Sequence, residues 1–406
     1  MVPEMGKTGE VKKASSLIAS FLKIFFIPAL YLIYRFRFDR KTSKHINRPC
    51  VILCNHTNVI DQFVVGVGFR FAINFVASDS IFRYGLLSRI MVALVQPIPF
   101  SKGSSDLIAV RNMFSVIKQG GAIAMFPSGN RSFFGDECTI VGGIGKLVKK
   151  LNAPLVLVQI RGGYNTKARW KVKTNRGKMT AGVTKVINTE ELASMSNEEV
   201  DKIIQQELNH NEFEYNKTAQ IIYRGRHKAE YLESVLFYCP QCSDTESLCS
   251  KGNDFYCRKC GMKVRINDTG FFEKTENAEK TPETILEWGR IQLNYFKGFD
   301  FSPFKNEALF KDSNISLFRA ERAKKEYLLG EGSIELYEDK FNICGQDFPF
   351  TETTTAIQGV RKFTVYRGNE VFAVYAPYRT NFMKYMICNY HLRNKKLETK
   401  EEYYGY

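Results

Sequence analysis

The sequence contains no internal repeat and no low-complexity segment, and it has only five histidines and two tryptophans in 406 residues. It therefore gives no sign of a repeat architecture. Its 44% hydrophobic and 25% charged content argues against wholesale disorder. A chain of this length is too long for one ordinary core, so we expect two or three domains.

Acidic residues are fewer than basic ones: the sequence has 42 Asp and Glu and 58 Lys and Arg, which gives a formal net charge of +16. Such a balance suits an anionic partner, which can be a phospholipid surface, a phosphorylated substrate or nucleic acid. Composition alone does not choose among these three.

A secretory signal peptide is also missing, since the start is polar and no small-residue cleavage site follows the first apolar stretch. The ten cysteines include two Cys-x-x-Cys pairs. In a chain without an export signal, this spacing favours metal binding over disulfide bonding and predicts a reducing, cytosol-facing location.

One long apolar stretch occurs at residues 16–34, within a leader that we place at 1–45. It is nearly long enough to span a bilayer, but Lys23 and Pro28 interrupt it. A helix that lies in or dips into the membrane interface fits this pattern better than a clean span, the alternative being a buried core helix. The basic residues that flank the stretch are Lys12, Lys13, Arg35, Arg37, Arg40 and Lys41.

Residues 46–230 alternate between strand-like and helical patterns. The alternation predicts an α/β fold with a mixed, mostly parallel sheet covered by helices. A later helical pattern at 189–209 has Ser194 or Ser196 as its candidate N-cap. The predicted strands are 48–54, 122–126 and 154–160, and the predicted helices are 61–71, 106–119 and 145–151.

Residues 276–406 change character. A helix is predicted at 282–296, followed by short alternating segments typical of antiparallel strands and by a helix at 381–392. This layout predicts a small C-terminal α+β domain, rich in strands and similar to a pleckstrin-homology fold. The alternating segments are 333–337, 340–343, 362–366 and 371–375.

A cysteine module, placed at 231–275, separates these two regions. Its candidate ligands are Cys239, Cys242, Cys257 and Cys260. Fourteen residues separate the two pairs, and four thiolates at this spacing can close a tetrahedron. We expect a structural Zn²⁺ site with no place for catalytic water. Cys249 falls in the loop between the pairs and is not expected to be a ligand.

The module resembles a zinc ribbon, and ribbons often bind nucleic acid or proteins. A zinc-dependent binding module is therefore one alternative function, and a lipid-binding adaptor built around residues 300–406 is another. We expect instead that the ribbon is a scaffold between the flanking domains, and nucleic acid is not an expected partner.

The candidate catalytic residues are His56 and Asp61, which follow the strand predicted to end near Cys54. On a continuous helix their spacing would separate the side chains by about 140°. The pair therefore works only if His56 lies in the strand-to-helix turn and Asp61 in the first turns of the helix. Asp61 would then orient the imidazole, and the other ring nitrogen would take a proton from a substrate hydroxyl.

A second segment, 126–132, follows the predicted strand at 122–126. Gly129 allows the backbone to approach a ligand closely. Arg131 supplies a planar guanidinium that suits a phosphate. Lys102, after another strand-like run, presents a further cation.

These two segments resemble the glycerophosphate and lysophosphatidate acyltransferases of the PlsC type. The first family motif, Asn-His-x-x-x-x-Asp, is met by Asn55, His56 and Asp61. A later motif is met by Phe126, Pro127, Gly129, Asn130, Arg131 and Ser132. The apolar strand that begins at Pro154 is similar to a further motif, and the resemblance covers roughly residues 45–225.

The resemblance implies transfer of a fatty acyl group from acyl-CoA or acyl-carrier protein to the free hydroxyl of 1-acylglycerol 3-phosphate, which gives phosphatidic acid. It implies that His56 is the base, Asp61 its orienting group and Arg131 a contact to the acceptor phosphate. The remaining substrate-binding candidates are Lys102, Ser128, Gly129 and Asn130. Some bacterial members are similar in carrying a zinc-ribbon appendage.

The sequence departs from the family motifs at two positions that are expected to contact the acceptor. Ser128 occupies the position of a family glutamate, and Lys102 stands where an arginine is usual. Acylation of another lysolipid, such as a lyso-aminolipid, is therefore an alternative reaction. The expected location is the cytoplasmic face of the cell membrane, as a peripheral or monotopic protein, and the oligomeric state is left open.

Overall fold

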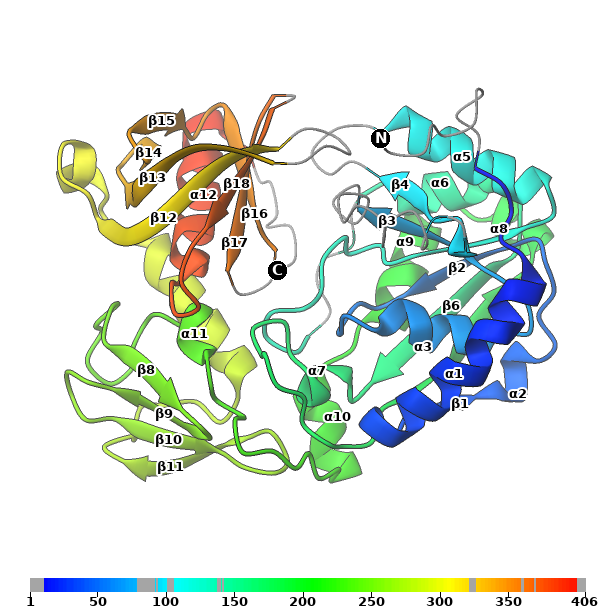
Figure 1. The fold of residues 1–406 in the computed structure, drawn as a ribbon, viewed down its shortest axis with the longest axis horizontal. Helices are drawn as coiled ribbons and strands as arrows, with labels where there is room; N and C mark the ends of the chain where they lie inside the picture. Colours follow the sequence, from blue (N-terminus) through cyan, green and yellow to red (C-terminus); the bar gives the residue numbers. More distant parts are fainter. Residues whose placement is uncertain are drawn as a thin grey trace.

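The structure is a computed structural model that describes residues 11–78, 92, 94–100, 106–136, 140, 142–320, 326–358, 361–368 and 370–399. Three sheets organise the chain (Figure 1). A mixed seven-stranded sheet is followed by a four-stranded antiparallel sheet and then by a seven-stranded antiparallel sheet with a long helix after it.

The first sheet has the strand order β1-β7-β6-β2-β5-β3-β4. Its strands are β1 Arg37–Asp39, β2 Cys50–Cys54, β3 Asn74–Ser78, β4 Ile98–Phe100, β5 Ala122–Met125, β6 Leu155–Arg161 and β7 Thr180–Ile187. The strands from β6 to β4 are parallel, whereas β7 is antiparallel to β6 and β1 is parallel to β7. The predicted mixed, mostly parallel sheet is confirmed.

Helices cover both faces of this sheet, which explains the continuous apolar runs of its central strands. Along β2, Val51 and Leu53 pack into one core with the helices α5 Leu107–Lys118, α6 Ile144–Leu151 and α9 Asn197–Leu208. The alternate residues Cys50 and Ile52 pack into a second core with α1 Ser16–Tyr34 and α3 Asp61–Gly68. Successive side chains of a strand point to opposite faces, so every residue of β2 is buried.

Several helices of the structure begin or end at other residues than the sequence predicts. The pattern at 61–71 stops at Gly68, because Phe69 already has an extended backbone. The pattern at 189–209 is two helices, α8 Thr189–Ser194 and α9, and Ser196 caps the second with a capping box to Glu199. The short helices of this region are α2 Arg40–Ser43, α7 Gly163–Thr166 and α10 Glu212–Ala219, and the turn η2 is Leu232–Ser234.

The second sheet carries the cysteine pairs in the order β11-β10-β9-β8. Its strands are β8 Leu248–Lys251, β9 Asp254–Cys257, β10 Lys263–Ile266 and β11 Phe272–Glu276. The expectation that Cys249 lies in a loop is wrong, because this residue is on β8 and pairs with Tyr256 of β9.

The third sheet has the order β15-β14-β13-β12-β18-β17-β16. Its strands are β12 Phe310–Ala320, β13 Tyr327–Leu336, β14 Lys340–Ile343, β15 Gln346–Pro349, β16 Thr353–Gln358, β17 Lys362–Arg367 and β18 Glu370–Tyr375. The helix α12 Phe382–Leu397 buries most of its residues against these strands. The predicted C-terminal antiparallel, strand-rich region is confirmed.

One hydrophobic cluster joins the three sheets. It runs from Phe133 and Trp170, beside the first sheet, through the ribbon to the C-terminal strands and α12. It includes the fully buried Trp288 of α11 Ile285–Lys297, whose indole nitrogen donates to the carbonyl oxygen of Tyr238 at 2.7 Å. The turn η3 Ser302–Lys305 connects α11 to the third sheet.

The leader helix α1 is held to the first sheet by a narrow stripe of residues. Phe26 stacks on Phe63 of α3 with ring centroids 4.5 Å apart, and Leu30 and Tyr34 are buried. Lys23 also faces inward, where its ammonium donates to the carbonyl oxygen of Phe69 at 2.5 Å. Lys23 therefore does not interrupt the outer surface of α1 as its charge suggested.

Candidate functional site

His56 and Asp61 meet at the carboxyl end of β2. His56 lies in the turn after the strand, and Asp61 is the first residue of α3. The His56 Nδ1 atom is 2.9 Å from Asp61 Oδ2, so the contact expected from the spacing is present. The Asp61 side chain is fully buried, whereas that of His56 is 18% exposed and can be reached from outside.

Backbone amides fix the Asp61 carboxylate. Oδ2 accepts hydrogen bonds from the amides of Thr57 at 2.6 Å and Asn58 at 2.7 Å, in addition to the imidazole contact. The position at the start of α3 adds the positive end of the helix dipole. Three donors on one oxygen leave the carboxylate little freedom to turn away from His56.

Asparagines anchor the turn that carries His56. The Asn55 carboxamide bonds to both backbone groups of Ile160 in β6, with N···O distances of 2.8 and 2.7 Å. Asn58 donates to the carbonyl oxygen of Gly163 at 3.1 Å and to the hydroxyl of Thr166 at 3.2 Å. The residues around His56 are therefore tied to the neighbouring strand β6 and to α7.

The segment after β5 lies against His56. The ring of Phe126 stacks on the imidazole with centroids 4.2 Å apart and an interplanar angle of 17°. The backbone amide of Ser132 donates to the carbonyl oxygen of His56 at 3.0 Å. Because β2 and β5 are adjacent parallel strands, their carboxyl ends bring the two motifs together.

The loop between Phe126 and Ser132 is tightly turned. Gly129 has φ +67°, and a β-carbon at this position would have open space around it. The backbone conformation, not crowding, therefore favours glycine here. Ser128 is buried, and its hydroxyl donates to the carbonyl oxygen of Asn130 at 3.0 Å. Asn130 is also buried, so Gly129 is the exposed member of the three.

Arg131 lies close enough to Asp61 for the two charges to interact. Burial lowers the pKa of Arg131, and the negative charge of Asp61 opposes that shift. A guanidinium remains protonated in proteins, so Arg131 supplies a fixed positive charge beside the His56–Asp61 pair. Such a charge suits an anionic group on a substrate.

Arg169 holds the backbone of Arg131 and was not identified as a site residue from the sequence. Its guanidinium donates to the carbonyl oxygen of Arg131 at 3.0 Å and also to that of Ile357 in the third sheet. It lies over the ring of Phe133 at 4.0 Å. No local pattern marks this role, because both carbonyl partners are distant in the sequence.

Tyr34 was also missed. It ends α1, it is buried, and the charge of Asp61 contributes to raising its pKa after the larger effect of burial. The leader helix thus ends beside the site. The predicted phosphate contact Lys102 lies outside the described residues.

The four predicted cysteine ligands gather at one point, with all four sulfur atoms within 4.8 Å of one another. The Sγ atoms of Cys239 and Cys260 are 3.8 Å apart, and so are those of Cys242 and Cys257. A tetrahedral zinc site with Zn–S bonds of about 2.3 Å requires S···S distances of about 3.8 Å. The four residues fit a bound metal ion.

A family model matches the part of the chain that contains His56 and Asp61. Residues 35–161 match the family model described as Acyltransferase. No curated protein matches the chain.

Among solved structures, the chain is similar to the 1-acyl-sn-glycerophosphate (LPA) acyltransferase PlsC from Thermotoga maritima, with 19% identity and a TM-score of 0.38. This similarity covers 50% of the present chain and 78% of that protein. The segment that matches the family model contains His56, Asp61 and the loop 128–131. The similarity to the Acyltransferase family therefore includes the candidate site.

Proposed function

We propose that the protein transfers a fatty acyl group from acyl-CoA or acyl-carrier protein to the free hydroxyl of 1-acylglycerol 3-phosphate. The observation that carries the proposal is the His56–Asp61 contact at 2.9 Å with the Arg131 charge beside it. This arrangement combines a base with a cation for an acceptor phosphate. The match of residues 35–161 to the Acyltransferase model supports the same reaction class.

The contacts of His56 assign a role to each ring nitrogen. Because Nδ1 faces the Asp61 carboxylate, Nδ1 carries the proton and Nε2 is left to accept one. Nε2 takes the proton of the acceptor hydroxyl as the oxygen attacks the thioester carbonyl. The imidazolium that forms is stabilised by Asp61, and it returns its proton to the departing thiolate. No protein nucleophile is needed.

The position of α1 supports a membrane-bound substrate. Among the described residues, α1 is the helix long and apolar enough to cross a membrane, with a mean hydropathy of 2.0. Leu17, Ile24 and Leu32 are each more than 60% exposed on its outer side. Since Tyr34 at its end lies near Asp61, α1 would hold the site at a lipid surface. We place the protein on the cytoplasmic face of the cell membrane.

We further propose that the cysteine cluster holds a structural Zn²⁺. Four thiolate ligands leave no coordination position for substrate, so the metal would supply stability to the ribbon and take no part in acyl transfer. Much of the ribbon's positive charge is paired on the protein itself. Arg265 contacts Asp254 at 2.6 Å and Lys259 contacts Asp244 at 2.9 Å. This pairing favours the scaffold role over nucleic-acid binding.

The proposal is tested by replacing His56. Transfer of labelled acyl groups from acyl-CoA to lysophosphatidate is measured for the wild type, for His56→Ala and for His45→Ala. His45 is an exposed histidine just after α2 and serves as the matched control. Loss of a general base costs typically 10²- to 10⁴-fold in rate. Full activity in His56→Ala would reject the mechanism, and loss in both variants would show that the effect is not specific.

The acceptor is tested at Ser128, whose hydroxyl is turned to the loop backbone. Lysophosphatidate and a lyso-aminolipid are compared as acceptors for the wild type, for Ser128→Glu and for Ser128→Ala. If Ser128 sets the acceptor, the ratio of the two rates changes in Ser128→Glu and less in Ser128→Ala. An unchanged ratio in both variants removes Ser128 as the cause of any unusual preference.

A further inference from the structure

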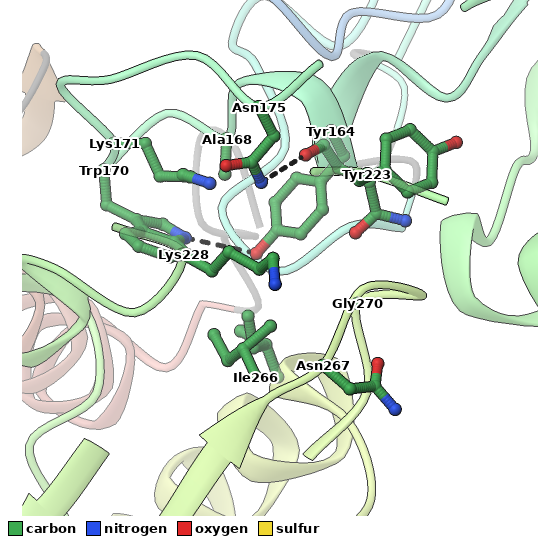
Figure 2. Close-up of a pocket in the computed structure, with 12 residues that line it drawn as sticks. Tyr164, Ala168, Trp170, Lys171, Asn175, Tyr223, Lys228, Ile266, Asn267 and Gly270 are labelled. Atoms are coloured by element: carbon green, nitrogen blue, oxygen red, sulfur yellow. Dashed lines mark hydrogen bonds between the residues drawn. The ribbon is translucent and has the colours of Figure 1, made fainter. Parts of the chain in front are cut away.

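A small pocket lies where the segment after β6 meets the ribbon (Figure 2). Residues 164–175 form one wall, and the ribbon turn around Asn267 forms another. Neither His56 nor Arg131 lines this pocket, so it is separate from the candidate acyl-transfer site.

Two buried lysines line the pocket. Lys171 is 6% exposed and Lys228 is 5% exposed, and Figure 2 shows both side chains extending beside Trp170. The ammonium of Lys228 contacts the carboxylate of Asp268 at 2.5 Å. Lys171 forms no ion pair or side-chain hydrogen bond with the residues that the structure describes. Its aromatic neighbour is Trp170, whose ring centroid is 5.8 Å from the ammonium.

Lys171 has no negatively charged partner among the described residues, whereas Lys228 has Asp268. A buried ammonium without a counter-charge is costly, and an aromatic ring at this distance offsets only part of the cost. Burial, and then the positive charge of Lys228, lower the pKa of Lys171 to about 7. The carboxylate at the site is that of Asp268, which is already bound to Lys228 and is half exposed. A compact anion in contact with the Lys171 ammonium would supply the missing negative charge and lower the cost of burying that ammonium.

The size of the pocket limits the ligand. Its volume is about 20 Å³, somewhat more than the roughly 10–15 Å³ that one water molecule requires. An acyl chain or a nucleoside does not fit. The pocket opens to solvent, so one oxygen of a phosphate group can enter it while the rest of that group stays at the mouth.

We propose that Lys171 and Lys228 form a binding site for a phosphate group, either inorganic phosphate or the phosphate of a small phosphomonoester. Lysine binds phosphate as a point charge, and Lys171 is the main contact because Asp268 competes for Lys228. A bound phosphate would hold the ribbon against the segment that follows α7. Since Asn58 bonds to Gly163 and Thr166 of α7, the site reaches the turn that carries His56.

The test uses the full-length, metal-loaded protein. Thermal unfolding and isothermal titration are measured with inorganic phosphate, with glycerol 3-phosphate, and with sodium chloride at matched ionic strength. The variant is Lys171→Met, which keeps the length of the side chain and removes its charge. The matched control is Lys178→Met, because Lys178 is an exposed lysine of the same segment that does not line the pocket.

Phosphate is expected to raise the unfolding midpoint of the wild type and of Lys178→Met, and Lys171→Met is expected to bind it at least tenfold more weakly. Without phosphate, Lys171→Met should be at least as stable as the wild type, because an apolar side chain replaces an unpaired buried cation. Protection by glycerol 3-phosphate as well identifies a phosphomonoester as a ligand source, and protection by phosphate alone identifies the free ion.

Equal phosphate binding by the wild type and Lys171→Met would overturn the proposal, and so would equal protection by chloride. If Lys171→Met does not fold, crystals of the wild type grown with selenate decide the question. An anomalous selenium peak within hydrogen-bonding distance of the Lys171 ammonium supports the site, and its absence there rejects it. Neither result depends on acyl transfer, so the outcome is separate from that of the proposed reaction.

Discussion

The Asp61→Asn variant tests the charge of the candidate pair without changing its shape. In the wild type, Asp61 Oδ2 accepts hydrogen bonds from His56 and from the amides of Thr57 and Asn58. The carbonyl oxygen of an asparagine can take the same place and keep all three contacts. Its amide nitrogen then occupies the position of Oδ1, which is buried and has no hydrogen-bond partner among the described residues. What is lost is the negative charge.

The size of the effect follows from the proposed imidazolium. Two opposite unit charges about 4 Å apart interact by about 4 kcal/mol at an effective dielectric constant of about 20. A factor of ten in rate corresponds to about 1.4 kcal/mol. If the carboxylate stabilises the imidazolium that forms in the transition state, the kcat for acyl transfer should fall about a thousandfold in Asp61→Asn, with a smaller change in KM.

The assay is transfer of a labelled acyl group from acyl-CoA to lysophosphatidate, together with the thermal midpoint of each protein. Asp39→Asn is the matched control, because Asp39 caps α2 through a hydrogen bond from the Lys41 amide at 3.0 Å and asparagine caps equally well. A kcat above one tenth of the wild-type value in folded Asp61→Asn would refute the reasoning. An equal loss in Asp39→Asn would show that the assay does not isolate the site.

Three further predictions concern the metal, the membrane and pH. Cys242→Ser should lose the bound zinc and unfold at a lower temperature, whereas the control Cys249→Ser should keep the zinc and the wild-type unfolding temperature. Metal analysis and calorimetry measure the two quantities, and equal zinc content in the two variants would contradict the four-cysteine site. Ile24→Asp on α1 should bind anionic vesicles more weakly than the control Leu107→Asp on α5, whose replaced side chain is also more than half exposed. Equal flotation of the two variants with vesicles would show that α1 is not the membrane contact. The stability of the wild type relative to Lys171→Met should rise between pH 7 and about 10. The reason is that the folded protein releases the Lys171 proton near pH 7, whereas the unfolded chain retains it to about pH 10.4. Urea unfolding at several pH values measures the difference in the free energy of unfolding between the two proteins, and a difference that does not change with pH would contradict the prediction.

Strands that are covered on both faces could be predicted from the sequence, because burial on each side requires an unbroken apolar run. β2, β5 and β6 are of this kind. The helix start at Asp61 was also predictable, since the spacing from His56 allows a contact only at a strand-to-helix turn.

Other strands were missed for an identifiable reason. β12 contains two register shifts, between Ser313 and Ile315 and between Leu317 and Phe318, which break the two-residue alternation that marks a strand. β7 has a similar irregularity opposite Leu157 and Val158. A period that is interrupted every few residues gives no clear signal in a single sequence.

The direction of a side chain was the second feature that could not be predicted from the sequence. Lys23 was taken to interrupt an apolar helix, yet it lies on the inward stripe with Phe26 and Leu30 and bonds to the carbonyl oxygen of Phe69. The outer face of α1 is therefore more apolar than the sequence of the helix indicates. Which face a lone charge occupies depends on the segment that packs against the helix, and here the hydrogen-bond partner Phe69 is 46 residues away in the sequence.

Contacts between distant segments also explain why the C-terminal part matters for the site. Arg169 bonds to the carbonyl oxygen of Arg131 on one side and to that of Ile357 in β16 on the other. Its guanidinium is buried over Phe133, so solvent does not compete with these bonds. The conformation of the Arg131 loop therefore depends on the third sheet as well as on the first. A sequence motif places Arg131 in the loop, but the fold of residues 310–375 contributes to holding it there.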